Sequence, residues 1–221
     1  MNDALTTMLG GQTGLSPSLK ILALLTLLSL LPAIVLTMSS FVRIVIVLSF
    51  VRQGIGTQQT PPTQVIVGLS MFLTLFTMSP VMNEIYAEAV RPVLDGTMTE
   101  AVAADVASVP IRRFMLRQTR QADLELFYSA TQAPLPSTPD DVPMRIAIPA
   151  FIVSELTTAF QMGVIVLLPF LVVDLAVASL LMSMGMMMVP PTMVSLPMKM
   201  LLFVLADGWN LLVGSLIQSF R

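Results

Sequence analysis

Four long uncharged segments constrain this chain more than any other feature of its sequence. They are Ile21 to Val42, Gln64 to Asn83, Leu156 to Val173 and Leu175 to Met198. A helix that crosses the core of a bilayer needs roughly 20 predominantly apolar residues, and each segment approaches or exceeds that length. The chain is therefore predicted to be an all-α integral membrane protein.

Charged residues are scarce, and they are unevenly placed. They make up 11% of the 221 residues, while apolar residues make up 55% and the mean hydropathy is +0.86. A typical globular domain has about 25% charged residues. Most of the charges lie between Asn83 and Arg145, the one segment that resembles a water-exposed domain. The net charge of −2 offers no basic surface, so no nucleic-acid partner is expected.

These patterns divide the chain into four parts with long, broken helical hairpins. The parts are an N-terminal segment (1–18), a first apolar helical hairpin region (19–82), a partly helical periplasmic segment with a proline-rich linker (83–145) and a second apolar helical region (146–221) with a methionine loop (182–200). Within the periplasmic segment, Ile111 to Ala130 has the spacing of an amphipathic helix. The N-terminus lacks the basic region of a secretory signal. Either the first apolar run is a retained anchor or a signal precedes Met1.

The positions of two arginines predict a membrane topology. Arg43 and Arg52 fall in the connection between the first two apolar runs, which is therefore expected to face the cytoplasm. The segment from Asn83 to Arg145 and the N-terminus then lie outside. The simplest count gives four membrane spans.

The residue types that most catalytic sites need are missing. The chain has no cysteine and no histidine, which excludes the common nucleophile–histidine arrangements and the zinc motif HExxH. A phosphate-binding GxxxxGK[ST] sequence is also absent. Asp174 and Asp207 could formally pair as in an aspartyl protease, but nothing around them requires catalysis. We expect no enzyme and no cofactor.

A methionine-rich segment, Ser183 to Met200, is too broken for an ordinary helix and too apolar for a solvated loop. Met186, Met187 and Met188 stand next to a glycine and a Pro-Pro pair. Methionine commonly fills gaps in a core, and its thioether can bind cuprous ions, as in a copper transporter. Irregular backbone at membrane depth survives only when it is buried in protein or lines a cavity. We therefore favour a flexible apolar loop that seals a passage.

Isolated charges in the apolar regions must find partners, because an unpaired buried charge is costly. The candidates for buried charges are Arg43, Glu155, Asp174, Lys199 and Asp207. Pairing within the chain would only stabilise the fold, whereas pairing between copies would order a ring. We expect Glu155 to pair with Lys199, with Arg120 as a further partner of Glu155, and we consider these three as inter-subunit contacts.

Two long stretches resemble a known family. Met38 to Val81 and Phe151 to Leu212 are similar to the two signatures of the FliP family of type III export-gate proteins. The SctR group of virulence injectisomes shares much of both stretches. The segments SMGMMMVPP and FLTLFTMSPV resemble the flagellar members more than the injectisome members.

The resemblance implies a function that composition alone does not show. Family members form a ring of five copies with FliQ and FliR, contacted by FlhA and FlhB, in the inner membrane at the centre of the flagellar basal body. Unfolded export substrates pass through this gate, and energy comes from the proton gradient and a separate ATPase. The family's pore gasket corresponds to Met186, Met187 and Met188. An injectisome gate, or less favoured a copper or small-ion transporter, is the alternative.

Overall fold

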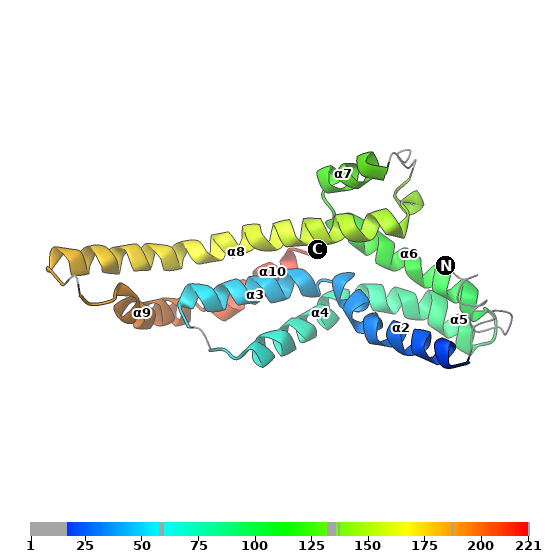
Figure 1. Ribbon diagram of the computed structural model, residues 1–221, viewed down its shortest axis with the longest axis horizontal. Coiled ribbons are helices and arrows are strands. Elements are labelled where there is room, and N and C mark those ends of the chain that lie inside the picture. Colours follow the sequence, from blue (N-terminus) through cyan, green and yellow to red (C-terminus); the bar gives the residue numbers. More distant parts are fainter. Residues whose placement is uncertain (1–16, 58–59, 132–135, 137, 187, 221) are drawn as a thin grey trace.

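The computed structural model describes residues 17–57, 60–131, 136, 138–186 and 188–220, and within these residues it contains helices and no strands (Figure 1). The predicted all-α fold is confirmed, while the N-terminal segment 1–18 lies almost wholly outside the described residues. The elements are α2 (Pro17–Thr37), α3 (Phe41–Ile55), α4 (Thr63–Ile85), a π-helical turn η1 (Tyr86–Val90), α5 (Arg91–Leu94), α6 (Glu100–Gln118), α7 (Gln121–Thr131), a 3₁₀ turn η2 (Pro139–Asp141), α8 (Met144–Ser183), α9 (Pro191–Leu205) and α10 (Gly208–Gln218).

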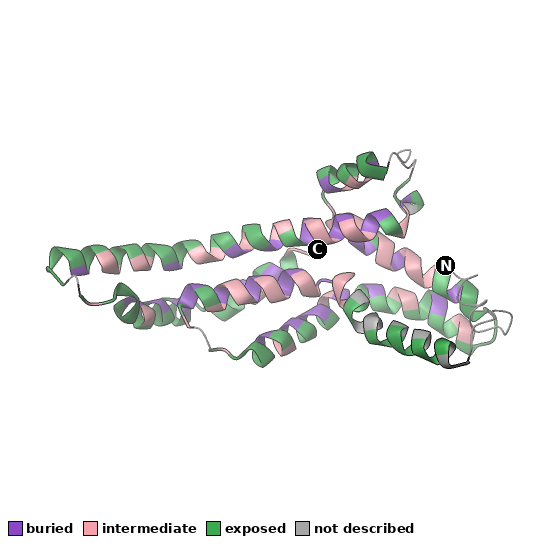
Figure 2. Cartoon of the chain, viewed as in Figure 1, coloured by how far each residue is buried: buried purple, intermediate pink, exposed green. Residues whose placement is uncertain are grey.

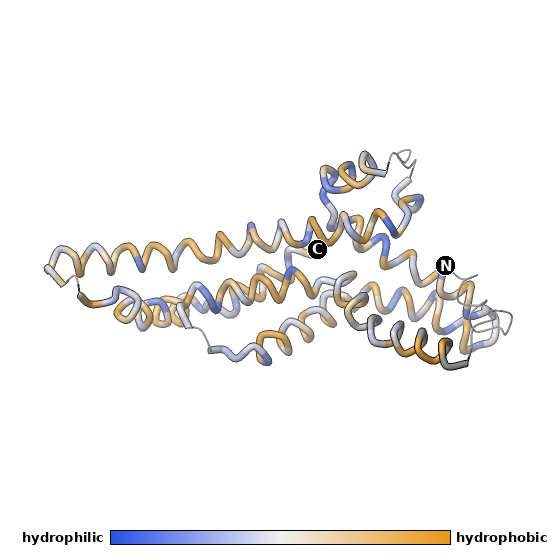
Figure 3. The backbone as a smooth tube through the Cα atoms, viewed as in Figure 1, coloured by the Kyte–Doolittle hydropathy of each residue, from blue (hydrophilic) through white to orange (hydrophobic). Residues whose placement is uncertain are grey.

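Helix α8 organises the molecule. Its 40 residues run unbroken through Pro149 and Pro169, for a length of about 60 Å at 1.5 Å per residue. Helices α3 and α9 lie along it, and α6 and α7 pack on its N-terminal part (Figure 1). Hydrophobic residues cover nearly its whole length, including the end that leads to α9 (Figure 3).

The first apolar block is divided between two helices. α2 ends at Thr37, and α3 begins at Phe41 after a short polar break. In that break the hydroxyl groups of Ser40 and Thr77 share a hydrogen bond of 2.6 Å, which ties the break to α4. α3 ends at Ile55 and is capped by Gly56, whose φ of +88° is the left-handed conformation that glycine adopts without strain.

The helix that contains the second apolar run extends beyond that run. The helix continues through Pro80 and the π-helical turn as far as Leu94, so the predicted boundary between residues 82 and 83 falls inside a helix. The amphipathic stretch from Ile111 to Ala130 is not one helix but parts of α6 and α7, with a break at Thr119 and Arg120. The extramembrane location of this segment stays a prediction.

Among the described residues, two helical stretches are long and apolar enough to cross a membrane, Thr63–Leu94 and Met144–Ser183. A third exists if α9 and α10, which are bent by 63° relative to each other, count as one span. The predicted topology assumed that Arg43 lies in the connection between the first two apolar runs. This assumption is wrong, because Arg43 is part of α3. It is a buried residue of α3, only 2% exposed.

Two clusters of buried side chains hold the helices together. One lies around α3 and includes Val47, Phe170 and Leu216 from α3, α8 and α10. The other joins the end of α4 to α6, α7 and the start of α8, with Met115 and Phe151 fully buried. Exposed residues dominate the far end of α8 and most of α9 (Figure 2). The chain therefore has a packed middle and a thinly covered helical hairpin at one end.

Candidate functional site

The methionine turn, Met184–Pro190, joins α8 to α9. It begins where the backbone amide of Met186 donates to the carbonyl of Leu181 at 3.0 Å, next to Gly185 with a φ of +75°. Proline at the first helical position suits a helix start, so α9 begins at Pro191 and continues through Pro197. The irregular segment is therefore shorter than the predicted loop 182–200.

The described methionines of this turn do not fill the core of the chain. Met188 is 97% exposed, and Met186 is 41% exposed. Met187 lies outside the described residues. The described thioether side chains are thus free to contact something other than this copy of the chain.

A second polar site lies in the packed middle of the molecule. Arg43 Nε donates to Glu155 Oε2 at 2.9 Å, and its Nη2 donates to the other carboxylate oxygen. Glu155 is 0% exposed. Such a bidentate pair fixes both side chains, because two parallel hydrogen bonds leave little freedom.

The remaining hydrogen-bonding capacity of Arg43 is also used. Its Nη1 donates to the carbonyl of Ser219 at 2.9 Å and to the hydroxyl of the same residue at 3.1 Å. Its Nη2 donates to Gln118 Oε1 at 3.1 Å, and the guanidinium lies 4.1 Å from the centre of the Phe220 ring. Together with Glu155, these four residues form what we call the Arg43 junction. It joins α3, α6, α8 and the end of the described chain.

A third polar site, the Asp174 cluster, ties α8 to α9 on the way to the methionine turn. Lys199 Nζ donates to Asp174 Oδ2 at 2.5 Å, and the Ser195 hydroxyl donates to Asp174 Oδ1 at 2.7 Å. The Lys199 side chain is 8% exposed and that of Asp174 is 34% exposed. One member of the pair therefore remains open to its surroundings.

The predicted pairing of Glu155 with Lys199 is wrong within the chain. Glu155 and Asp174 are separated by about 28 Å along α8, and Lys199 is bonded to Asp174. Arg120 does not reach Glu155 either, because its guanidinium bonds Asp123 at 2.9 Å. Contacts of Arg120, Glu155 and Lys199 between copies stay a prediction.

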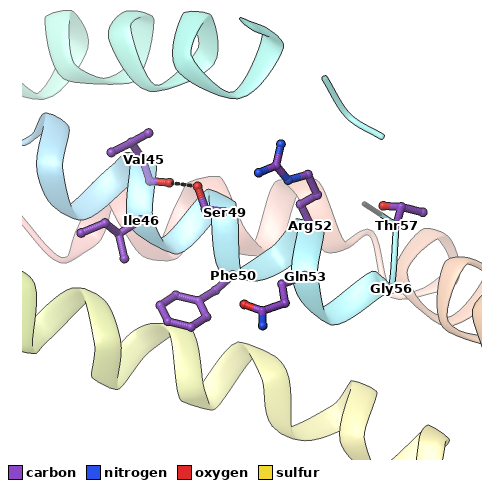
Figure 4. Close-up of a pocket in the computed structure, with 8 residues that line it drawn as sticks. All are labelled: Val45, Ile46, Ser49, Phe50, Arg52, Gln53, Gly56 and Thr57. Atoms are coloured by element: carbon purple, nitrogen blue, oxygen red, sulfur yellow. Dashed lines mark hydrogen bonds between the residues drawn. The ribbon is translucent and has the colours of Figure 1, made fainter. Parts of the chain in front are cut away.

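One further charge differs from expectation. Asp207 is exposed rather than buried; it adopts a φ of +49° at the start of α10 and accepts a hydrogen bond of 3.0 Å from Asn210. Arg52 donates to Thr63 Oγ1 at 2.9 Å across the turn between α3 and α4. It borders a groove of about 610 Å³ along α3, in which Phe50 and Gln53 point toward α8 (Figure 4).

The comparisons with known proteins identify the family. A family model described as the FliP family matches residues 24–216. The chain is 54% identical over 211 residues to the flagellar biosynthetic protein FliP of Pectobacterium carotovorum subsp. carotovorum. The aligned region covers 96% of this chain and 81% of that protein. It is 51% identical over 205 residues to the flagellar biosynthetic protein FliP of Bacillus subtilis (strain 168), with 93% of each chain covered. The chain belongs to the FliP family.

The chain is also 46% identical over 220 residues to the flagellar biosynthetic protein FliP of Caulobacter vibrioides. That aligned region covers 99% of this chain and 83% of the relative. As a FliP-family protein, the chain is a component of the flagellar export apparatus in the inner membrane at the basal body, and it is not an enzyme. Because these relatives are flagellar proteins, the flagellar interpretation is preferred to the injectisome one. Membership of the FliP family also argues against a copper transporter.

Several residues of this FliP-family chain have structural roles that the sequence did not suggest. Ser219 and Phe220 cover Arg43, and Ser195 supports Asp174. On the other side of α8, the Ser154 hydroxyl donates to Asp123 Oδ2 at 2.5 Å. The hydrogen bond from Arg120, followed by that from Ser154, lowers the pKa of Asp123 below its ordinary value. Apart from the local pair Arg120–Asp123, no spacing in the sequence connects these residues, because their contacts cross between helices.

Proposed function

We propose that this chain forms the main ring of the flagellar export gate, as five copies assembled with FliQ and FliR and contacted by FlhA and FlhB. Unfolded flagellar proteins pass through the ring, and the methionine turns of the five copies close it when nothing is passing. The observation that carries this proposal is the exposure of Met186 and Met188 at the tip of a thinly covered helical hairpin.

Exposed apolar side chains support assembly into a larger complex. Phe72 and Leu75 on α4 and Leu175 on α8 are large apolar side chains that are exposed. Large apolar patches on a protein surface mark contacts with other proteins or with lipid. In a ring of copies, some of these faces pack against neighbours and the outermost face the membrane.

Methionine suits a seal that must adapt to its cargo. Its side chain is unbranched and flexible, with a polarizable thioether that packs well against irregular surfaces. A rigid aromatic ring would fit fewer cargo shapes. α8 ends at Ser183, just before the left-handed Gly185, and α9 begins at Pro191, so Met186 and Met188 lie between two helix ends rather than along a helix face.

The proposal predicts that the methionines prevent leakage. Replacing Met186, Met187 and Met188 together by serine should leave the complex with FliQ and FliR intact, because none of the described methionines of the turn is buried in the chain. The same change should make membranes that carry the complex permeable to a small dye. Dye uptake by vesicles containing the purified complex measures this.

Met193 provides the matched control, because it is 74% exposed on α9 and lies outside the turn. Met193→Ser should not increase dye uptake. If the triple replacement assembles and its dye uptake remains at the wild-type level, the methionine turn is not the seal.

A further inference from the structure

The buried face of α9 near the methionine turn is unusual for a membrane-associated helix. In the stretch from Pro191 to Met200, the buried residues are Ser195 and Lys199, one helical turn apart. Both are polar, and both bond Asp174 of α8. The hairpin is therefore joined at this level by a polar contact, where an apolar stripe would ordinarily be expected.

The opposite helix is loosely held along the same length. We call Leu171–Ser183 of α8 the distal arm. In it, only Leu181 is buried, and large side chains such as Val172 and Leu180 are 64% and 61% exposed. Between apolar helices in a membrane there is little hydrophobic drive to associate, and polar contacts then contribute specifically to pairing. The Asp174 cluster thus fixes how far the distal arm and α9 can slide or separate.

The cluster is anchored to the packed middle of the molecule. Lys199 Nζ lies 3.8 Å from the position that a Cβ on Gly56 would occupy, at the C-terminal end of α3. The last carbonyl groups of a helix carry partial negative charge and stabilise a nearby cation. Lys199 is therefore held between Asp174 and the end of α3, so the ion pair connects the distal hairpin to the packed middle of the molecule.

We infer that the Asp174 cluster is a latch that holds the methionine turn in its closed position, and that the turn is released when the contact between Asp174 and Lys199 is broken. This inference rests on the proposed function of the turn as the seal. Asp174, Ser195 and Lys199 act as positioning residues: they touch no cargo and set the register of the two helices that carry the turn. Registry is the best-attested role of a buried ion pair.

The test measures the position of the turn directly. The chain has no cysteine, so spin labels can be attached at Leu180→Cys and Met193→Cys, both exposed and on opposite sides of the turn. The labelled chain is assembled with FliQ, FliR and an excess of unlabelled copies, so that only distances within one chain are recorded. We expect one narrow distance in the wild type and the loss of that narrow distance in Asp174→Asn.

Asp174→Glu distinguishes a latch from a general sensitivity of this position to substitution. It keeps a carboxylate opposite Lys199 and should therefore keep the narrow distance. Asp207→Asn is the matched control, since among the described residues this exposed carboxylate bonds only its neighbour Asn210. A narrow distance in an assembled Asp174→Asn complex, or a broadening in Asp207→Asn as large as that in Asp174→Asn, would overturn the latch.

Failure of a variant to assemble and failure of the proposed seal are distinguished by separate measurements. If Asp174→Asn does not assemble, Lys199→Gln decides the matter: it removes the cation that bonds Asp174, so the distance should broaden, and an unchanged distance again overturns the latch. Failure of the proposed seal is detected independently, as wild-type dye uptake after the triple methionine replacement. The distance measurement reports on the latch whether or not the turn seals the pore.

Discussion

The two ends of α8 are held in different ways. Up to Phe170, which we call the proximal part, the helix lies closely against α3: a Cβ on Gly54 would approach Phe170 Cδ2 to 2.5 Å, and one on Gly163 would approach Phe50 Cγ to 2.6 Å. This part also carries the fully buried Glu155. The distal arm has no comparable contact with α3 among the described residues, and its polar tie is the partly exposed Asp174.

This difference separates two uses of an ion pair. At the Arg43 junction the charges are buried and bonded on every side, so the pair cannot open without leaving an unpaired charge in the interior. At the Asp174 cluster one carboxylate is a third exposed, so its surroundings can stabilise it when the pair opens. The first arrangement fixes a fold, and the second is suited to an element that moves.

The largest expected effect comes from breaking the Arg43 junction. Glu155→Ala leaves the Arg43 guanidinium buried without its carboxylate, which costs about 3–5 kcal/mol for a buried pair. We expect the purified complex with FliQ and FliR to lose thermal stability and to dissociate into smaller species. Size-exclusion chromatography in detergent and thermal unfolding measure both effects.

A double variant and an exposed pair serve as controls. Arg43→Met with Glu155→Leu should recover much of the loss, because replacing a buried pair by apolar residues is often neutral. Glu84→Ala removes the partner of Arg113, whose side chain is 48% exposed, and should cost less than about 1 kcal/mol. If Glu155→Ala costs no more than Glu84→Ala, the junction does not fix the fold.

Much of this architecture is predictable from the sequence. The lengths of the uncharged segments indicate membrane helices, and Gly185 with Pro190 and Pro191 indicates where the helix breaks. Family resemblance then supplied the function. Helix ends were harder to predict, because helices continue through Pro80 and Pro197 when neighbouring packing compensates for the lost backbone hydrogen bond.

The pairing of charges was not predictable. The apolar residues around Glu155 indicate that its carboxylate needs a cation, but Lys199 and Arg120 were the predicted partners, and the structure pairs it with Arg43. The choice depends on the rotation and register of α3 and α9 against α8, which are decided by glycine contacts such as Gly163 with Phe50. Residues that complete the junction, such as Ser219 and Phe220, have no charge or motif that would single them out.

A smaller effect is expected from loosening the contact between α3 and the proximal part of α8. In Gly163→Ala the new methyl group would fall within the space of the Phe50 ring, which already packs edge-on against Phe160 with ring centres 5.3 Å apart. Moving that ring costs about 1–3 kcal/mol, as overpacking usually does. Thermal unfolding of the purified complex should show the destabilisation.

Gly68 on α4 is the matched control, because a Cβ there would meet nothing within 4 Å. Gly68→Ala should be neutral or stabilise by up to about 1 kcal/mol through helix propensity. Equal effects of the two substitutions would mean that the proximal part of α8 is not closely packed and would remove the contrast with the distal arm.

The smallest effect concerns the other side of the proximal part, where α7 packs on α8. The Asp123 carboxylate accepts hydrogen bonds from Arg120 and Ser154, and these lower its pKa. A lowered pKa contributes stability that is complete above the ordinary pKa of aspartate and is lost as the pH falls through the lowered value. Protection of the α7 amides against hydrogen exchange should therefore decrease at acidic pH in the wild type.

Asp123→Asn should weaken the docking of α7 by about 1 kcal/mol, because it replaces charge-assisted hydrogen bonds by neutral ones, and it should remove the acid-dependent part of the protection. Glu125→Gln is the control: this exposed side chain bonds Gln121 on the same helix and not α8. Its protection should still decrease in acid. If Asp123→Asn keeps the wild-type pH dependence, another group controls the docking of α7. The proximal part of α8 would then be held by α3 and the Arg43 junction without a titratable contribution from Asp123.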